Sequence, residues 1–590
     1  MVNNIKKRIQ KFFVCFLVCF AFILFFRYIL GEKFDISKDL GYLATFSGLY
    51  AITASLWSYS RCYFILSIFF FLLHLFVAWL KIWSGMLLPE REITHTLCYA
   101  ITLFSSIAIL FYAANLITFN CLRRFAKTLV LLLYACCLLP VMIIIGYVAV
   151  NNSLFSTDII MAIFQTNFEE TIAYLQSQNI LLWSIGTIII ILIIGTQLYC
   201  LTRLKIELRQ IRSLFFAFCL LLYAGIAIFP KLNLNYIHNL AMTTYSELHG
   251  FTEFKQARKI KLQQLKSLNL TSPQKGIYVL VIGESLTKDH MSLYGYARQT
   301  TPWLDKFTKN SNVIAFQNAY ANHTHTVPAL SFALSEKNQY NNLELEKVAS
   351  IIDVAEAAGY KTYWLSNQLK YSLCDTPINI IGASADTSKW INTNTGDKLS
   401  TSFYDEKLLD FIPQNDATDK ALIVIHLMGN HNLYQDRYPI EFHKFSGSND
   451  SIDTYDNSIL YNDYVIKKIY ERMVKNPNFK ALVYFADHGD DVDNHLGHNS
   501  SLFTYRMARI PLIIGFSEQF SSQNSDIINN LRLNQNAYWT NDLIYNLLIG
   551  LMQIKGLENN DETLDLSSAD YKLPKEDVLL LHGEKNLQDE

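Results

Sequence analysis

Seven long apolar runs fill the first 230 residues of this 590-residue chain and constrain its fold more than any other feature. Each run is long enough to cross the hydrocarbon core of a bilayer as a helix. The sequence therefore predicts a helical membrane domain over residues 1–230, in which the second run is the most polar. The runs lie near residues 12–30, 40–59, 63–83, 94–118, 128–150, 180–200 and 213–229.

The first run also has the basic start of a signal peptide, but two observations favour a retained span. The sequence around Arg27 offers no small residue for cleavage, and six further runs follow. Lys and Arg are concentrated before the first run and in every second loop after it. This pattern places those loops in the cytoplasm and, with seven spans, predicts that the polar half of the chain lies outside.

The predicted outer loop at 151–179 contains an amphipathic stretch followed by Asn167, Glu169 and Glu170. Two interpretations stay open. The loop is either a platform for a lipid headgroup, with Asn167 and Glu169 or Glu170 contacting an amine, or a short interfacial helix that packs against the polar domain. Residues 231–274 are polar and mildly basic, and we interpret them as a bridge along the membrane surface.

Net charge and cysteine usage limit the partners of the chain and the forces that hold its polar half together. With 50 basic and 51 acidic residues the chain lacks a strongly basic surface, so nucleic acid is not expected as a partner. Nine of the ten cysteines lie in the apolar half, where cysteine is a small apolar residue. Only Cys374 lies in the polar half, so that half must be held together by its own core.

From about residue 275 the pattern alternates between strands and helices. This predicts an α/β domain over 275–590 with a largely parallel sheet. In such sheets, ligands collect at the carboxyl ends of the strands. The predicted strands are 277–283, 313–319, 361–366, 421–427, 480–486 and 509–515.

Three of these predicted strands end in groups that bind metals or phosphates. Glu284 follows the first strand, Asp487 and His488 follow the strand at 480–486, and His431 follows the strand at 421–427. Each group alone is more typical of a polar surface turn. Together, Glu284, Asp487 and His488 form an oxygen and nitrogen set that suits zinc if a hydroxyl is the fourth ligand.

A hydroxyl-rich segment about 40 residues after Glu284 supplies two candidates, Thr324 and Thr326. Both precede Val327-Pro328, where a helix is predicted to begin, and a helix N-terminus favours phosphate oxygens. A metal would lower the pKa of such a hydroxyl and prepare it for attack on phosphorus. Either threonine could instead be a simple helix cap.

The stretch from Gly283-Glu284 to Pro302, the segment 426–431, Asp487-His488-Gly489 and the later His498 resemble, in order, the membrane phosphoethanolamine transferases. These enzymes belong to the alkaline phosphatase and sulfatase superfamily, and the resemblance is closer to the heptose- and sugar-modifying branch than to the lipid A branch. The lipid A branch has a disulfide-rich soluble domain and five spans, and this chain departs from both features.

The resemblance implies zinc held by Glu284, a threonine nucleophile, Asp487 and His488, with a second divalent metal left open. It places His431 and His498 around the donor phosphate, where they would bind oxygens or protonate the leaving group. Spacing from Glu284 favours Thr324 over Thr326 as the nucleophile. Other polar groups of the family near the donor correspond less surely to Asn367 and Gln368.

The implied function is transfer of phosphoethanolamine from phosphatidylethanolamine, through a phosphothreonine, to a hydroxyl of an envelope glycolipid or glycan such as the lipopolysaccharide core or lipid A. The implied location is the bacterial inner membrane, with the catalytic domain in the periplasm. Three alternatives stand beside this function. Phosphoglycerol transfer would use the same metal site. A sulfatase would need a Cys or Ser motif at the nucleophile position, and none is present there. An inactive membrane scaffold would have no reason to combine these residues. The acceptor and the oligomeric state stay open.

Overall fold

The computed structural model divides into two compact units, which we call the helical unit and the α/β unit. The helical unit comprises Met1–Ile160 with Gln178–Tyr245, and the α/β unit comprises Met161–Ser177 with Ser246–Glu590. Tyr245, where the helical unit ends, lies within the predicted bridge at 231–274. The structure describes residues 2–30, 32, 36–83, 91–151, 153–165, 180–204, 210–273, 275–369, 376–392, 403–413, 419–447 and 450–590.

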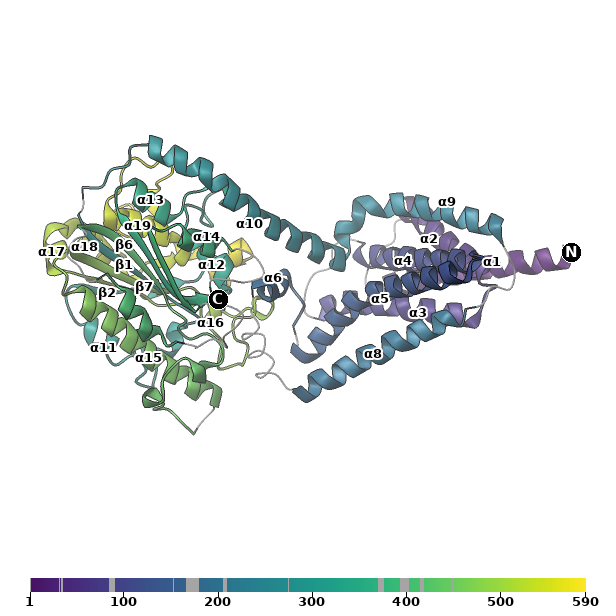
Figure 1. Cartoon of the computed structure of the whole chain (residues 1–590), viewed down its shortest axis with the longest axis horizontal. Coiled ribbons are helices and arrows are strands. Elements are labelled where there is room, and N and C mark those ends of the chain that lie inside the picture. The colour runs from purple at the N-terminus through teal and green to yellow at the C-terminus, as the bar shows by residue number, and fades with distance from the viewer. Residues whose placement is uncertain are drawn as a thin grey trace. The chain divides into compact units, whose positions relative to one another are not determined.

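The seven apolar runs all form helices, and they make up the helical unit (Figure 1). Among the described residues, six of these helices are long and apolar enough to cross a membrane. The seventh is α2, the run predicted to be the most polar. The helices are α1 (Val2–Ile29), α2 (Ile36–Leu56), α3 (Arg61–Trp83), α4 (Glu92–Leu116), α5 (Asn120–Asn151), α8 (Ile180–Thr202) and α9 (Ile211–Ile228).

The buried Thr53 hydroxyl of α2 has partners inside the bundle. The helix packs against α1, α4 and α9 and buries Ser47 and Thr53 completely. Thr53 Oγ1 donates to the carbonyl of Leu49 and lies 2.6 Å from the hydroxyl of Tyr63. Because such groups can bond to neighbouring helices, a span inside a bundle tolerates polar residues that a lipid-facing helix does not.

Ion pairs join the ends of consecutive helices. At the end of α1, Arg27 lies 3.0 Å from Glu32 and 3.0 Å from Asp39, which belongs to the first turn of α2. At the end of α3, Lys81 lies 2.7 Å from Glu92 in the first turn of α4. These side chains are almost fully buried, so the charges depend on one another for stability.

The predicted amphipathic loop begins with the short helix α6 (Thr157–Gln165). Asn167, Glu169 and Glu170 lie outside the described residues. The predicted bridge is largely one 32-residue helix, α10 (Tyr236–Ser267), which follows a 3-10 helix at Phe229–Leu234.

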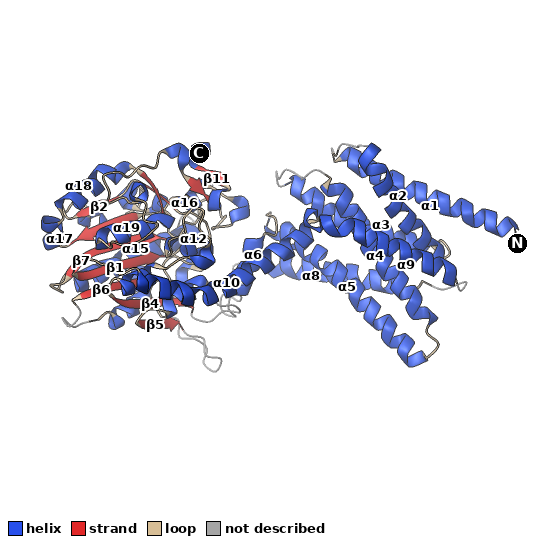
Figure 2. Ribbon diagram, turned by 90° about the horizontal axis from the view of Figure 1, so that it is seen from above, coloured by secondary structure: helices blue, strands red, loops and turns tan. Residues whose placement is uncertain are grey.

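A seven-stranded sheet forms the centre of the α/β unit (Figure 2). Its strand order is β2-β8-β7-β1-β6-β4-β5, with parallel pairing from β7 to β5 and antiparallel pairing of β8 with both neighbours. The predicted α/β fold with a largely parallel sheet is therefore confirmed. The strands are β1 (Gly276–Gly283), β2 (Val313–Ala315), β4 (Lys361–Leu369), β5 (Thr387–Asn392), β6 (Lys420–His426), β7 (Phe479–Ala486) and β8 (Leu512–Phe516).

Two details differ from the sequence prediction. The run at 313–319 divides into β2 and β3 (Asn318–Tyr320), and β3 pairs with β9 (Tyr538–Thr540) away from the main sheet. The edge strand β5 was not predicted, because its sequence, Thr387-Ser-Lys-Trp-Ile-Asn392, lacks the continuous apolar run of the inner strands. Every residue of β1 and β7 is buried, as expected for parallel strands covered on both faces.

Helices cover both faces of the sheet (Figure 1). The helices α11 (Leu304–Phe307) and α15 (Asp450–Met473) lie on one face, and α13 (Ile351–Ala357) and α19 (Ile544–Met552) lie on the other. The carboxyl ends of β7, β1, β6 and β4 meet at one edge of the sheet. The remaining elements are α12 (Thr326–Ala333), α14 (Pro377–Ala383), α16 (Tyr505–Ala508), α17 (Glu518–Gln523), α18 (Ser525–Leu533), β10 (Leu579–Leu580) and β11 (Lys585–Asn586).

Candidate metal centre

The pairing of β1 with β7 brings the first two predicted ligands together. Gly283 stands opposite Ala486, so Glu284 and Asp487 emerge side by side from neighbouring strands. The backbone N–H of Asp487 donates to the carbonyl of Gly283 over 3.1 Å and continues the ladder. One ligand atom from each of Glu284, Asp487 and His488 lies within 4.8 Å of the others, and all three residues are buried.

Asp487 presents one oxygen atom to the centre of this cluster. Its Oδ1 accepts the backbone N–H groups of Ser285 and His488, over 3.0 and 2.7 Å. Its Oδ2 is buried and has no hydrogen-bond partner among the described residues. Ser285 adopts a left-handed φ of 54°, a strained conformation of the kind that is found at functional sites.

The electrostatics of the cluster favour a bound cation. Burial, together with the neighbouring Glu284, raises the pKa of Asp487 to about 8, and burial raises the pKa of Glu284 to about 7. Burial lowers the pKa of His488, which keeps its imidazole neutral and able to bind a metal. Two buried carboxylates, one of them with an oxygen that has no hydrogen-bond partner among the described residues, and a neutral imidazole are a donor set that fits a divalent ion such as zinc.

Thr326, rather than Thr324, reaches this cluster. Its Oγ1 lies 3.1 and 3.3 Å from the two carboxylate oxygens of Glu284 and 3.3 Å from Nε2 of His488. The Oγ1 of Thr324 is buried and has no hydrogen-bond partner among the described residues. Because α12 begins at Thr326, the helix start places this hydroxyl at the site. The geometry therefore does not support the preference for Thr324 that spacing suggested.

The end of β4 contributes Asn367 and Gln368. Gln368 Nε2 donates to Glu284 over 3.2 Å and to the carbonyl of Leu427 over 2.8 Å, so it orients a candidate ligand. Asn367 Nδ2 instead donates to Phe403 and Asp405. Gln368 therefore lies at the site, whereas the described contacts of Asn367 support the adjoining loop.

The loop after β6 is hydrogen-bonded to the backbone of Glu284. Asn430 donates its backbone N–H to the carbonyl of Glu284 over 2.9 Å, and Asp405 accepts the N–H groups of Met428 and Gly429. Gly429 has a φ of 51°, and a Cβ atom there would lie 2.8 Å from the nitrogen of Glu284. Only glycine allows this close approach, which explains the Gly in the segment that carries His431.

His498 is held by a carboxylate that the sequence did not reveal. Its Nδ1 lies 2.7 Å from Oδ1 of Asp490, whose other oxygen accepts the hydroxyl of Tyr434 over 2.7 Å. Burial alone would lower the pKa of His498, but Asp490 outweighs it and raises that pKa. The ring of His498 lies 4.6 Å from that of His488, and His488, Asp490 and His498 form a second group whose ligand atoms could hold a metal.

Two further histidines complete the surroundings. Burial and the charges of Arg437 and His498 lower the pKa of His431 to about 3, so the predicted His431 is a neutral group within electrostatic range of the site. The ring of His325 lies 5.3 Å from that of His498. The structure thus brings together Glu284, Asp487, His488, Thr326, Gln368 and His498.

Comparisons with known proteins bear on the family and the fold of the chain. The sequence profile of the sulfatase family matches residues 277–551, a range that contains β1, β7 and the whole carboxylate cluster. This stretch is a sulfatase-family domain. Among solved structures, the integral membrane protein lipooligosaccharide phosphoethanolamine transferase A (EptA) from Neisseria meningitidis matches with a TM-score of 0.58 at 18% identity, covering 86% of this chain and 98% of that chain. This likeness supports the fold as a whole, helical unit included.

Curated relatives match part of the chain. Phosphoethanolamine transferase EptC of Escherichia coli (strain K12) is 34% identical over 265 residues, which are 41% of this chain and 45% of that protein. Phosphoethanolamine transferase CptA of Salmonella typhimurium is 30% identical over 265 residues, again 41% and 45%. The match thus spans about half the length of these relatives.

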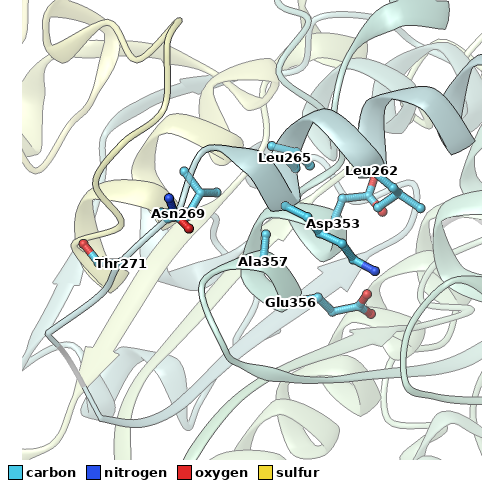
Figure 3. Close-up of a pocket in the computed structure, with 9 residues that line it drawn as sticks. Leu262, Leu265, Asn269, Thr271, Asp353, Glu356 and Ala357 are labelled. Atoms are coloured by element: carbon cyan, nitrogen blue, oxygen red, sulfur yellow. The ribbon is translucent and has the colours of Figure 1, made fainter.

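The α/β unit also contains a cavity of about 480 Å³ between the end of α10 and α13 (Figure 3). Its carboxylates already have partners. Asp353 pairs with Arg258 and accepts the hydroxyl of Ser350, and Glu356 accepts the hydroxyl of Thr362. None of the cluster residues is among those that line this cavity. We therefore assign the chemistry to the strand ends.

Proposed function

We propose that this protein transfers phosphoethanolamine from phosphatidylethanolamine to a hydroxyl of an envelope glycolipid or glycan. The observation that carries the proposal is the Thr326 hydroxyl, which lies within hydrogen-bond distance of Glu284 and His488 in a cluster suited to a divalent metal. A lipid donor accounts for a catalytic domain joined to apolar helices. The names of the relatives EptC and CptA support the choice of headgroup.

The metal-binding residues in this proposal are Glu284, Asp487, His488 and Thr326. A zinc ion bound there supplies positive charge that favours the ionised hydroxyl and stabilises the transferring phosphoryl group. The second group, His488, Asp490 and His498, leaves room for a second divalent metal in the proposal.

The reaction then proceeds in two displacements at phosphorus. In the first, Thr326 Oγ1 forms a bond to phosphorus while the bond from phosphorus to the diacylglycerol oxygen breaks. The Thr326 hydroxyl proton passes to Glu284, and His498 gives a proton to the diacylglycerol oxygen. In the second, the acceptor oxygen forms a bond to phosphorus while the bond from phosphorus to Thr326 Oγ1 breaks. His498 takes the acceptor proton, and the proton held by Glu284 returns to Thr326 Oγ1.

We propose that His498 gives a proton to the leaving oxygen and takes a proton from the entering oxygen. Asp490 binds its Nδ1, which leaves Nε2 for the substrate. We propose that His431 binds the phosphoryl oxygens and that Gln368 and Asn367 shape the donor site. Asn167 and Glu169 of the 151–179 loop are proposed to contact the ethanolamine amine. The setting is the bacterial inner membrane, with the sulfatase-family domain in the periplasm.

Replacing the two threonines separately tests the nucleophile. Thr326→Ala should reduce transfer from labelled phosphatidylethanolamine by more than about 1000-fold and abolish the covalent adduct found by peptide mass spectrometry. Thr324→Ala should change the rate by less than about threefold, since its hydroxyl has no described bond to the cluster. An adduct on Thr324 would refute the assignment.

The same assay separates phosphoethanolamine transfer from phosphoglycerol transfer. Labelled phosphatidylethanolamine should yield the adduct, and labelled phosphatidylglycerol should not. Mass spectrometry of envelope glycolipids and glycans from cells with and without the protein then identifies the acceptor. Adduct formation from phosphatidylglycerol alone would overturn the proposed headgroup.

A further inference from the structure

Two buried asparagines connect the nucleophile segment to the metal-binding strand. Asn322 precedes Thr326 by four residues, and Asn541 follows β9, more than 200 residues later. Both side chains are completely buried. Asn541 Oδ1 accepts the backbone N–H and the side-chain Nδ2 of Asn322, over 2.8 and 2.7 Å. Its own Nδ2 donates to the carbonyl of Asp487 over 2.7 Å.

The Asn322 side chain spans the segment that contains Thr326. Its Nδ2 also donates to the carbonyl of Ala329 over 3.0 Å, inside the first two turns of α12. The chain from residue 322 to residue 329 is therefore closed into a loop by one side chain. Thr326 lies in the middle of that loop, so the position of Asn322 sets the position of the Thr326 hydroxyl.

His582, near the end of the chain, contacts Oδ1, the remaining polar atom of the Asn322 side-chain amide. Its Nε2 lies 2.9 Å from Asn322 Oδ1, and its backbone N–H donates to the carbonyl of Asn322 over 3.2 Å. Its ring stacks on Phe332 of α12 at 3.9 Å. Leu581 and His582 both adopt positive φ angles, of 49° and 53°. The backbone is therefore strained at Leu581 and His582, where the imidazole contacts Asn322.

The bonding pattern allows only one orientation of the two amides. A flipped Asn541 would oppose its NH₂ group to two N–H donors of Asn322 and its oxygen to the carbonyl of Asp487. A flipped Asn322 would oppose its oxygen to the carbonyl of Ala329. Since buried donors and acceptors left without partners are costly, the network holds a single geometry.

We propose that Asn541 is a positioning residue, which sets the distance between the Thr326 hydroxyl and the metal-binding end of β7 through Asn322, with His582 completing the bridge. The proposal rests on the proposed function only for the role of Thr326 as nucleophile. Because the bridge joins the nucleophile loop directly to the backbone of Asp487, its loss should misplace the hydroxyl without removing any group that contacts substrate.

The test compares full-length Asn541→Ala with wild type in detergent. We expect kcat for transfer from labelled phosphatidylethanolamine to fall by about 10- to 100-fold, with KM changed by less than about twofold. Protein loaded with cobalt(II) instead of zinc should show an altered visible absorption spectrum, because this spectrum reports the arrangement of groups around the ion. A merely structural role would lower the melting temperature and leave kcat per folded molecule and the spectrum unchanged.

A matched control and a second variant keep the result decisive. Asn534 also donates two hydrogen bonds to backbone carbonyls, those of Leu566 and Ser568, but has no described contact with the site, so Asn534→Ala should leave kcat and the spectrum unchanged. If Asn541→Ala does not fold, His582→Phe decides. It retains a ring against Phe332 and the backbone bond to the Asn322 carbonyl, loses the side-chain bond to Asn322 Oδ1, and should lower kcat about three- to tenfold.

The cobalt spectrum separates this inference from the proposed function. A wild-type protein that transfers nothing from phosphatidylethanolamine would refute the function, while a spectrum altered in Asn541→Ala and not in Asn534→Ala would still support the bridge. Unchanged spectrum and kcat in folded Asn541→Ala, or in His582→Phe where the first variant does not fold, would overturn it.

Discussion

At the scale of single residues, Glu284 and Asp487 make the metal-free site sensitive to pH. Burial raises their pKa values from 4.5 and 3.8 to about 7 and about 8, with mutual repulsion adding to the shift of Asp487. The folded protein then keeps protons that the unfolded chain releases. Stability from these groups is fully present below about pH 4 and is lost as the pH rises through about 8.

Melting temperatures of chelator-treated protein measure this effect. Between about pH 5 and about pH 8 the wild type should lose more stability than Asp487→Asn, which lacks the second charge. Zinc added at about pH 8 should restore the melting temperature of the wild type and have little effect on the variant, since a bound ion replaces the missing protons. Equal losses of stability in the wild type and the variant would contradict the buried pairing of Glu284 with Asp487.

Residue patterns explain which parts of the site could be predicted. Glu284, Asp487 and His488 each follow a continuous apolar strand, so their convergence could be inferred from the sequence. The choice between Thr324 and Thr326 depends on the residue at which α12 begins, and spacing alone cannot settle this. Asn541 and Asp490 belong to the site through tertiary hydrogen bonds, which leave no signal in their local sequence.

At the scale of elements, the buried ion pairs between helix ends should contribute strongly to the helical unit. Arg27 of α1 holds the carboxylates of Glu32 and Asp39, so Arg27→Met would leave two buried acids without their shared cation. Removing one partner of such a group costs about 3–5 kcal/mol. We therefore expect a clearly lower melting temperature for the detergent-solubilised variant.

The exposed pair of Lys347 with Glu344 in the α/β unit provides the control. Both of these side chains are more than 60% exposed, and water and salt screen a solvent-exposed pair so that it contributes little to stability. Lys347→Met should therefore melt close to the wild type. A similar, small effect of both substitutions would show that the helix ends are held by packing alone.

Element prediction succeeded where apolar runs were continuous, and failed where tertiary contacts decided. The helices of the helical unit and the inner strands of the sheet are long apolar stretches, which the sequence displays directly. The edge strand β5 and the pairing of β3 with β9 depend on neighbours that are distant in sequence. Likewise, the polarity of α2 is explained by helices that surround it, and no local pattern encodes them.

At the scale of the whole molecule, each unit has its own hydrophobic core. The core of the α/β unit is built around the sheet and includes Phe254 and Leu265 of α10, and a separate core joins the helices of the helical unit. A domain with its own core is expected to fold alone. We therefore expect a fragment comprising residues 246–590 to unfold cooperatively and to bind zinc stoichiometrically.

The same fragment should separate the chemistry from the use of a membrane lipid. It should cleave a small, water-soluble phosphodiester of ethanolamine at a rate comparable to the full-length protein, because the cluster of Glu284, Asp487, His488 and Thr326 lies entirely within it. Transfer from phosphatidylethanolamine in vesicles should fall by about 100-fold or more, since the fragment no longer holds its active site beside a bilayer. The matched control is the fragment with Thr326→Ala, which should bind zinc and cleave neither substrate. Undiminished transfer from vesicles would mean that the helical unit serves another purpose than access to the lipid donor.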